Sequence, residues 1–279
     1  MKVFLLLRKK WKKMKNKKSN LKLTAVLFFF IVSSTCFGQF NEIIRTGRPG
    51  QSIGAFTVGK NVLQFQQGIN YYSIEDTNPI KGFVSNNIIR YGISETIEVS
   101  TLIDYQNEEI SFENNTYKHR EGISNLHFGF RAHINEQKGW FPVTGFQMRL
   151  KIPNVSCEFE TKYVAADMIF VANWVLPKNM SLATNWVMSY SGNDPNPLGK
   201  YVINFGFQIH KKLSGFVGNY GQINQSVFQT RFEGGFAYLI NNDFAIDLSS
   251  GFGKNQGLTD YFVSTGISYR FLKFRNSVK

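Results

Sequence analysis

Serines and histidines are the residues of this chain whose types could support catalysis. A nucleophilic serine needs a base within hydrogen-bond reach, and three of each residue type fall on one face of the predicted strands described below. They are Ser249, Ser264, Ser268, His127, His133 and His210. No recognisable nucleophile motif surrounds these serines, so the sequence does not predict an enzyme.

Metal ligands are scarce. His127 and His133 lie six residues apart on one face of a predicted strand. At roughly 3.3 Å per residue they are about 20 Å apart, too far to share one ion. We therefore expect no metal site and no cofactor.

Charged side chains in the middle of predicted strands are the stronger candidates for function. All lie on the polar face of their strands, where they suit a water-filled or hydrogen-bonded lumen that small solutes cross. They are Arg90, Arg131, Arg149, Asp167, Arg231, Glu233, Asp247 and Arg270. In the alternative interpretation, opposite charges pair across a narrow lumen and only hold it shut.

The elements that position these charges follow from a hydrophobic period of two between Asn61 and the end of the chain. In the segment 125–134, apolar Leu126, Phe128 and Phe130 alternate with polar or small residues such as Arg131. This pattern predicts a strand with one apolar face, and several such segments reach the roughly 9–11 residues that a tilted membrane strand needs. Clear or weaker alternation marks twelve segments in all, and none has a helical period.

The predicted connections alternate between short turn-forming clusters and longer polar segments, the longest being 106–122. Short periplasmic turns and longer outer loops are typical of a bacterial outer-membrane barrel. The sequence therefore predicts an all-β chain, a single transmembrane antiparallel up-and-down β-barrel of about 12 strands. A soluble β-sandwich is the alternative, but sandwich strands usually have about five or six residues.

The N-terminus has the order of a secretory signal peptide: a basic run, about ten apolar residues (23–32) and small residues before Gly38. Translation starts at Met1 or at Met14, since a complete signal also follows Met14. We expect a signal peptide over 1–38, a periplasmic N-terminal segment at or inside the barrel mouth over 39–60, the barrel over 61–271 and a tail over 272–279. Removal of the leader leaves Cys157 alone, which excludes an intramolecular disulfide.

The formal net charge of +13 belongs to the leader. Ten lysines and arginines precede residue 39 with no acidic residue among them, which leaves 22 basic against 19 acidic residues in the remainder. The exported chain is close to neutral, so the charge does not indicate a nucleic-acid partner.

Several segments resemble a known family of outer-membrane barrels, described as "putative MetA-pathway of phenol degradation". The resemblance begins at 45–51 and 56–65, continues at 90–95 and 175–179, and is strongest at 247–253 and 260–271. It implies a passive transporter or channel for small solutes, including aromatic or other hydrophobic organic molecules. Gly47 departs from the family, which usually has Asp there, so any role of that acid is lost or moved.

The expected function is therefore passive transport across the outer membrane of a Gram-negative bacterium, with membrane lipid, the barrel-assembly machinery and a small solute as partners. The alternative is a non-conducting structural barrel, or an adhesive one acting through 106–122; a barrel enzyme is less favoured. Tyr269 and Phe271 at the end of the last strand predict the insertion signal. Because eight residues follow Phe271, this signal must be read internally.

Overall fold

The structure is a computed structural model that describes residues 42–112, 117–153, 155–224, 227–255 and 258–272. The predicted signal peptide, its cleavage site and residues 273–279 of the predicted tail lie outside these residues. Within them, no helix is long and apolar enough to cross a membrane.

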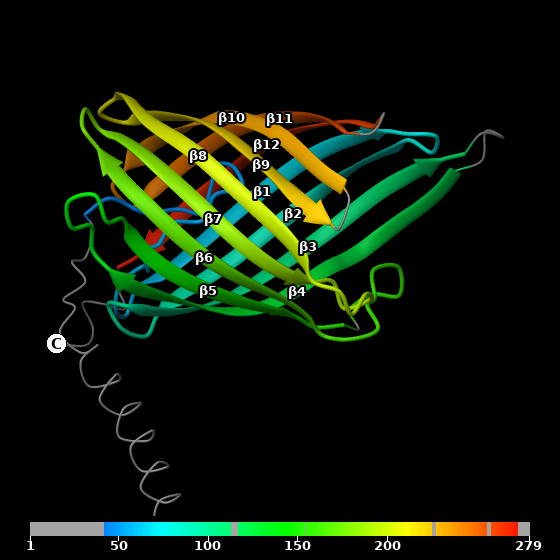
Figure 1. Ribbon diagram of the computed structural model, residues 1–279, viewed down its shortest axis with the longest axis horizontal. Coiled ribbons are helices and arrows are strands. Elements are labelled where there is room, and N and C mark those ends of the chain that lie inside the picture. The colour runs from blue at the N-terminus through cyan, green and yellow to red at the C-terminus, as the bar shows by residue number, and fades with distance from the viewer. Residues whose placement is uncertain (1–41, 113–116, 154, 225–226, 256–257, 273–279) are drawn as a thin grey trace, which may run out of the picture. The chain divides into compact units, whose positions relative to one another are not determined.

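Twelve antiparallel strands form one closed barrel (Figure 1). They are β1 (Leu63–Glu75), β2 (Ile80–Gly92), β3 (Ile97–Ser111), β4 (Tyr117–Asn135), β5 (Val143–Lys151), β6 (Ala165–Leu176), β7 (Met180–Tyr190), β8 (Leu198–His210), β9 (Leu213–Asn224), β10 (Val227–Asn241), β11 (Phe244–Asn255) and β12 (Leu258–Phe271). Each strand pairs with its sequence neighbours, and β1 closes the ring against β12, from Leu63 opposite Phe271 to Glu75 opposite Thr259. The predicted fold class and strand number are confirmed.

The apolar and polar faces of the strands lie on the predicted sides of the barrel wall. Large apolar side chains such as Phe128, Phe232 and Phe252 lie on the outer wall, where they are 51%, 53% and 63% exposed. Polar and charged residues at the intervening positions are buried inside. This arrangement, with apolar residues outside and polar residues inside, is the reverse of that in a soluble protein. A barrel wall that faces lipid requires it.

The end of the barrel at which β1 begins and β12 ends is here called the turn end; the opposite end, which has the longest connection, between β5 and β6, is the loop end. At the loop end the strands extend further than predicted. The expected loop over 106–122 was wrong, because β3 continues to Ser111 and pairs in register with β4 from Tyr117. Both faces of this hairpin are polar, so the apolar alternation stops although the backbone ladder continues.

The residues that precede β1 lie inside the ring of strands (Figure 1). We call residues 42–61 the plug. Its contacts begin at the turn end, reach the middle of the barrel where Gln51 meets Glu233 of β10, and return to the turn end before β1. Ala55 of the plug packs with Val143, Ile169 and Val171 of the inner wall in the buried apolar cluster of the molecule.

Candidate functional site

Side chains of the barrel wall hold the plug mainly through hydrogen bonds to the backbone of the plug. Asn185 of β7 makes two hydrogen bonds to Ile53: its Oδ1 accepts from the backbone N at 2.7 Å and its Nδ2 donates to the carbonyl at 2.9 Å. The Ala55 backbone N donates to Asn173 Oδ1 at 2.8 Å. Because side chains of different strands satisfy polar backbone atoms that the lumen would otherwise leave unpaired, the plug needs no secondary structure of its own.

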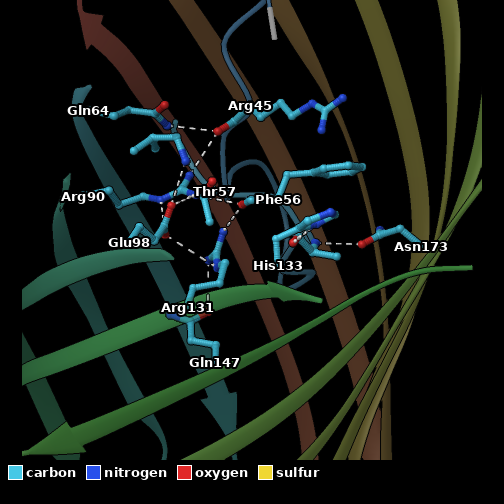
Figure 2. Close-up of polar contacts among 12 residues, drawn as sticks. Arg45, Phe56, Thr57, Gln64, Arg90, Glu98, Arg131, His133, Gln147 and Asn173 are labelled. Atoms are coloured by element: carbon cyan, nitrogen blue, oxygen red, sulfur yellow. Dashed lines mark hydrogen bonds and ion pairs between the residues drawn. The ribbon is translucent and has the colours of Figure 1, made fainter. Parts of the chain in front are cut away.

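Glu98 of β3 is the centre of a buried charged cluster (Figure 2). Its side chain is fully buried and accepts two hydrogen bonds of 2.8 Å from the guanidinium of Arg90. Arg131 Nε lies 3.6 Å from the same carboxylate, and the backbone N of Val58 in the plug donates to it at 2.9 Å. A buried carboxylate is stable only with such compensation, and here the compensation ties three strands and the plug together.

The two arginines of this cluster also bind plug carbonyls (Figure 2). Arg90 Nη1 donates to the carbonyl of Arg45 at 3.0 Å, and Arg131 Nη1 donates to the carbonyl of Phe56 at 3.1 Å. The Phe56 ring lies between Arg45, whose guanidinium carbon is 3.5 Å from the ring centroid, and His133, whose ring stacks on it at 5.8 Å. Burial lowers the pKa of Arg45, and the Glu136 carboxylate opposes this shift.

A second ion pair holds the part of the plug that leads from the turn end to the middle of the barrel. Arg48 donates from Nη2 to Asp247 Oδ1 at 3.1 Å and to Ser264 Oγ at 2.9 Å. The guanidinium lies against Gly68 and Gly266, and a Cβ added at either glycine would overlap it. The glycines of β1 and β12 therefore make a niche in the wall for this one side chain.

Two chambers adjoin the plug. The outer chamber has a volume of about 400 Å³ and contacts barrel residues from β1 to β5, including Arg90, Asp104 and Arg149. The inner chamber, of about 410 Å³, is lined by residues near the turn end such as His210 and Lys212. Arg48 lines both chambers, so it stands where they approach each other.

All eight charged residues predicted from the sequence lie on the inward positions of their strands, and the structure gives each a polar partner. Arg90 and Arg131 share Glu98, Asp247 binds Arg48, and Glu233 accepts from the backbone N of Gln51 at 2.9 Å. The remaining pairs are Arg149 with Asp167 at 3.0 Å, Arg231 with Asp260 at 2.6 Å, and Arg270 with Asp243. Their part in solute passage stays a prediction, because these contacts also fit the alternative in which the charges hold the barrel shut.

Four further residues that hold the plug were not predicted. Glu98, Asn173, Asn185 and Arg48 were not among the predicted site residues, although each contacts the plug or belongs to it. A signal existed for Glu98, which stands between Ile97 and Val99 at an inward position of its strand. Asparagines give no comparable signal, since they are common on polar strand faces.

The two residues predicted as the insertion signal lie on the outer wall near the end of β12. Tyr269 and Phe271 are both 40% exposed, and their rings contact each other edge to face at 4.6 Å between centroids. Tyr269 also meets Phe244 of β11 edge to face. The pair thus forms part of an aromatic patch at the turn end, which is the location such a signal requires; its recognition stays a prediction.

Metal and nucleophile sites have little support in the described part of the chain. No group of three or more His, Cys, Asp or Glu residues there could hold a metal ion. No described serine is hydrogen-bonded to a histidine; His133 Nδ1 instead donates to the carbonyl of Ala55 at 3.3 Å.

Known structures share the fold. An outer membrane channel from Pseudomonas putida F1 superposes with a TM-score of 0.65 at 8% identity, covering 80% of this chain and 99% of that one. The β domain of the Bordetella autotransporter BrkA gives a TM-score of 0.53 at 10% identity, covering 75% and 99% of the two chains. The NanC porin gives 0.50 at 9% identity, covering 73% and 98%. At these identities the likeness shows a common barrel fold.

Sequence comparison identifies the family. No curated protein sequence matches the chain. One family, described as "Putative MetA-pathway of phenol degradation", matches residues 46–271, which include most of the plug and all twelve strands. The chain belongs to this family.

Proposed function

We propose that the chain is a passive channel for small organic solutes in the outer membrane of a Gram-negative bacterium. The observation that carries the proposal is the pair of chambers, each of about 400 Å³, on either side of the plug in a barrel whose outer wall is apolar. A solute would enter the outer chamber from the loop end and leave through the inner chamber at the turn end. Displacement of the plug near Arg48 would join the two chambers.

The polar interior supports transport more than a purely structural role. Amides of the outer chamber, such as Asn70 and Asn125, face an open volume instead of a packed core. A barrel that served only as a scaffold has no need to keep such a volume, because apolar packing of the interior stabilises as well or better. The proposal is of transport and not of catalysis, and the similar solved structures are a channel, a porin and an autotransporter domain.

Planar-bilayer recording tests the proposal. The purified full chain should give discrete conductance steps, and these should become larger or more frequent when the plug is loosened. A folded barrel that gives neither conductance nor solute flux into liposomes, with or without a loosened plug, would contradict the proposal and favour a non-conducting structural or adhesive barrel. Fractionation checks the location, since recovery in the soluble periplasmic fraction would exclude the outer membrane.

A further inference from the structure

The outer chamber combines two kinds of wall that the proposed function does not by itself require. On β2 and β3, the inward side chains of Val84, Ile88 and Leu102 line it, although inward positions elsewhere in this lumen are mostly polar. Ile88 and Leu102 are directly paired across the two strands, so they form one continuous apolar patch. A patch of this kind in a wet chamber stabilises an apolar part of a solute.

The other wall is basic. Arg131 and Arg149, from β4 and β5, line the same chamber. Arg149 stands opposite Gly129 of β4, and a Cβ added at that glycine would lie 3.2 Å from Arg149 Cγ and 3.1 Å from Ser100 Oγ of β3. The small residues Gly129 and Ser100, which are paired with each other, thus leave room for the Arg149 side chain between β5 and the apolar patch on β3.

Arg149 keeps an unused donor. Its Nη2 donates to Asp167 at 3.0 Å, but its Nε is buried and has no hydrogen-bond partner. The Arg149 side chain is 26% exposed and lines the chamber, so an acceptor that enters can reach its guanidinium. Leaving the buried Nε unsatisfied is costly, and a shift of the guanidinium towards such an acceptor would relieve this cost. The charges near Asp167 point the same way, because Lys200 Nζ also lies 4.0 Å from its carboxylate, so Arg149 shares this aspartate with a second cation.

The carboxylate oxygens of the two acidic residues that line the chamber already have hydrogen-bond partners. Glu98 is occupied by Arg90, Arg131 and the backbone N of Val58. Asp104 accepts hydrogen bonds from the side-chain amides of Asn86 and Asn125.

We propose that the outer chamber is a binding subsite for a small organic acid, with the carboxylate on Arg149 and the apolar body on the patch formed by Ile88 and Leu102. The volume of about 400 Å³ lies in the range of roughly 300–1,000 Å³ typical of small-molecule sites. A carboxylate is the acceptor whose planar geometry best matches a guanidinium. The inference rests on the proposed function, because such a subsite selects solutes only if solutes cross the barrel.

The chain offers a closely matched control. Arg231 also pairs with an aspartate on the neighbouring part of the inner wall, but Asp260 satisfies both its Nε and its Nη2. The side chains of Arg149 and Arg231 are 26% and 27% exposed, and those of their aspartate partners are both 15% exposed. Arg231 does not line the outer chamber. The two arginines therefore differ in the unused donor and in the chamber, but not in the exposure of the arginine or of its aspartate partner.

The test is calorimetric titration of the full chain in detergent with benzoate, with benzyl alcohol as the neutral probe of similar size and acetate as the anion without an apolar body. We expect benzoate to bind more tightly than either, and Arg149→Gln to weaken benzoate by about tenfold or more, as loss of a charge-assisted hydrogen bond predicts. Arg231→Gln should leave benzoate affinity unchanged. Leu102→Asn should weaken benzoate and leave acetate unaffected, and heat-modifiable gel migration confirms that each variant is folded.

Two results would overturn the inference: equal affinity for benzoate and benzyl alcohol, or equal loss of benzoate affinity in the folded Arg149→Gln and Arg231→Gln variants. Conductance measured on the same preparations separates this outcome from failure of the proposed function. A conducting barrel without a preference for benzoate overturns the subsite alone. A barrel that passes neither ions nor solutes overturns the proposed function, and the subsite with it as a determinant of transport.

Discussion

Replacing Asn185 by leucine should release the plug while leaving the barrel intact. Asn185 is 1% exposed and makes two hydrogen bonds with the backbone of Ile53, at 2.7 and 2.9 Å. Leucine has nearly the same size but can replace neither bond. The β7 ladder does not depend on this side chain, so the loss falls on the contact between plug and wall.

The magnitude follows from these two bonds. At about 1 kcal/mol each they contribute about 2 kcal/mol, and unsatisfied burial of the Ile53 backbone groups raises the loss in the docked state to about 4 kcal/mol. Since 1.4 kcal/mol is a factor of ten, the equilibrium between docked and released plug should shift by about 30-fold to several hundred-fold. The open fraction of single channels in a planar bilayer measures this shift.

Asn204→Leu is the control. Asn204 lies on the adjacent strand β8 and lines the inner chamber, but the structure gives its side chain no hydrogen bond to the plug. The Asn204→Leu substitution should leave the open fraction of the channel at the wild-type value. If folded Asn185→Leu and Asn204→Leu channels open equally often, the backbone contacts do not hold the plug closed and the reasoning is refuted.

Three further predictions concern stability and assembly. Glu98→Ala should lower the free energy of unfolding by about 3–5 kcal/mol, because it leaves two buried guanidinium groups without their carboxylate; denaturant titration in detergent measures this, and a loss below 1 kcal/mol would contradict it. Gly92→Ala should cost about 1–3 kcal/mol in the same assay, since its Cβ would overlap the Gly59 carbonyl, whereas Gly199→Ala, whose Cβ meets nothing closer than 3.7 Å, should be tolerated. Phe271→Ala should impair barrel assembly while truncation of 272–279 leaves it intact, as judged by heat-modifiable migration; normal assembly of Phe271→Ala would count against the insertion signal.

The barrel itself was predictable because the alternation that produces each strand is visible within a short segment of the sequence. Each strand must present apolar residues to lipid at every second position, and Leu126, Phe128 and Phe130 show that period directly in the sequence. The predicted loop over 106–122 was wrong because the alternation stops there. Beyond the apolar wall both faces of the hairpin formed by β3 and β4 are polar, so its paired residues resemble a loop in the sequence.

The segment 39–60 was expected at or inside the barrel mouth, but the conformation of the plug was not predictable, because residues of distant strands determine it. Residues 42–61 have no regular period, and their backbone partners include Asn173, Asn185 and Glu233 on three different strands. A sequence pattern reports which face a strand buries but not which residues of distant strands meet inside the ring. The eight charged residues were therefore placed on the correct face, whereas Glu98, the centre of the buried cluster with Arg90 and Arg131, was missed.

The closure of the ring by β1 and β12 has a consequence for the order in which the molecule is made. The plug is synthesised before every strand, yet the groups that hold it come from β1 to β12, and the last of them, Arg270, donates to the carbonyl of Glu42. A partly made barrel thus lacks a complete docking site. Residues 42–61 should therefore become resistant to protease only when β1 has paired with β12. The time at which this resistance develops measures the time at which assembly of the barrel is complete.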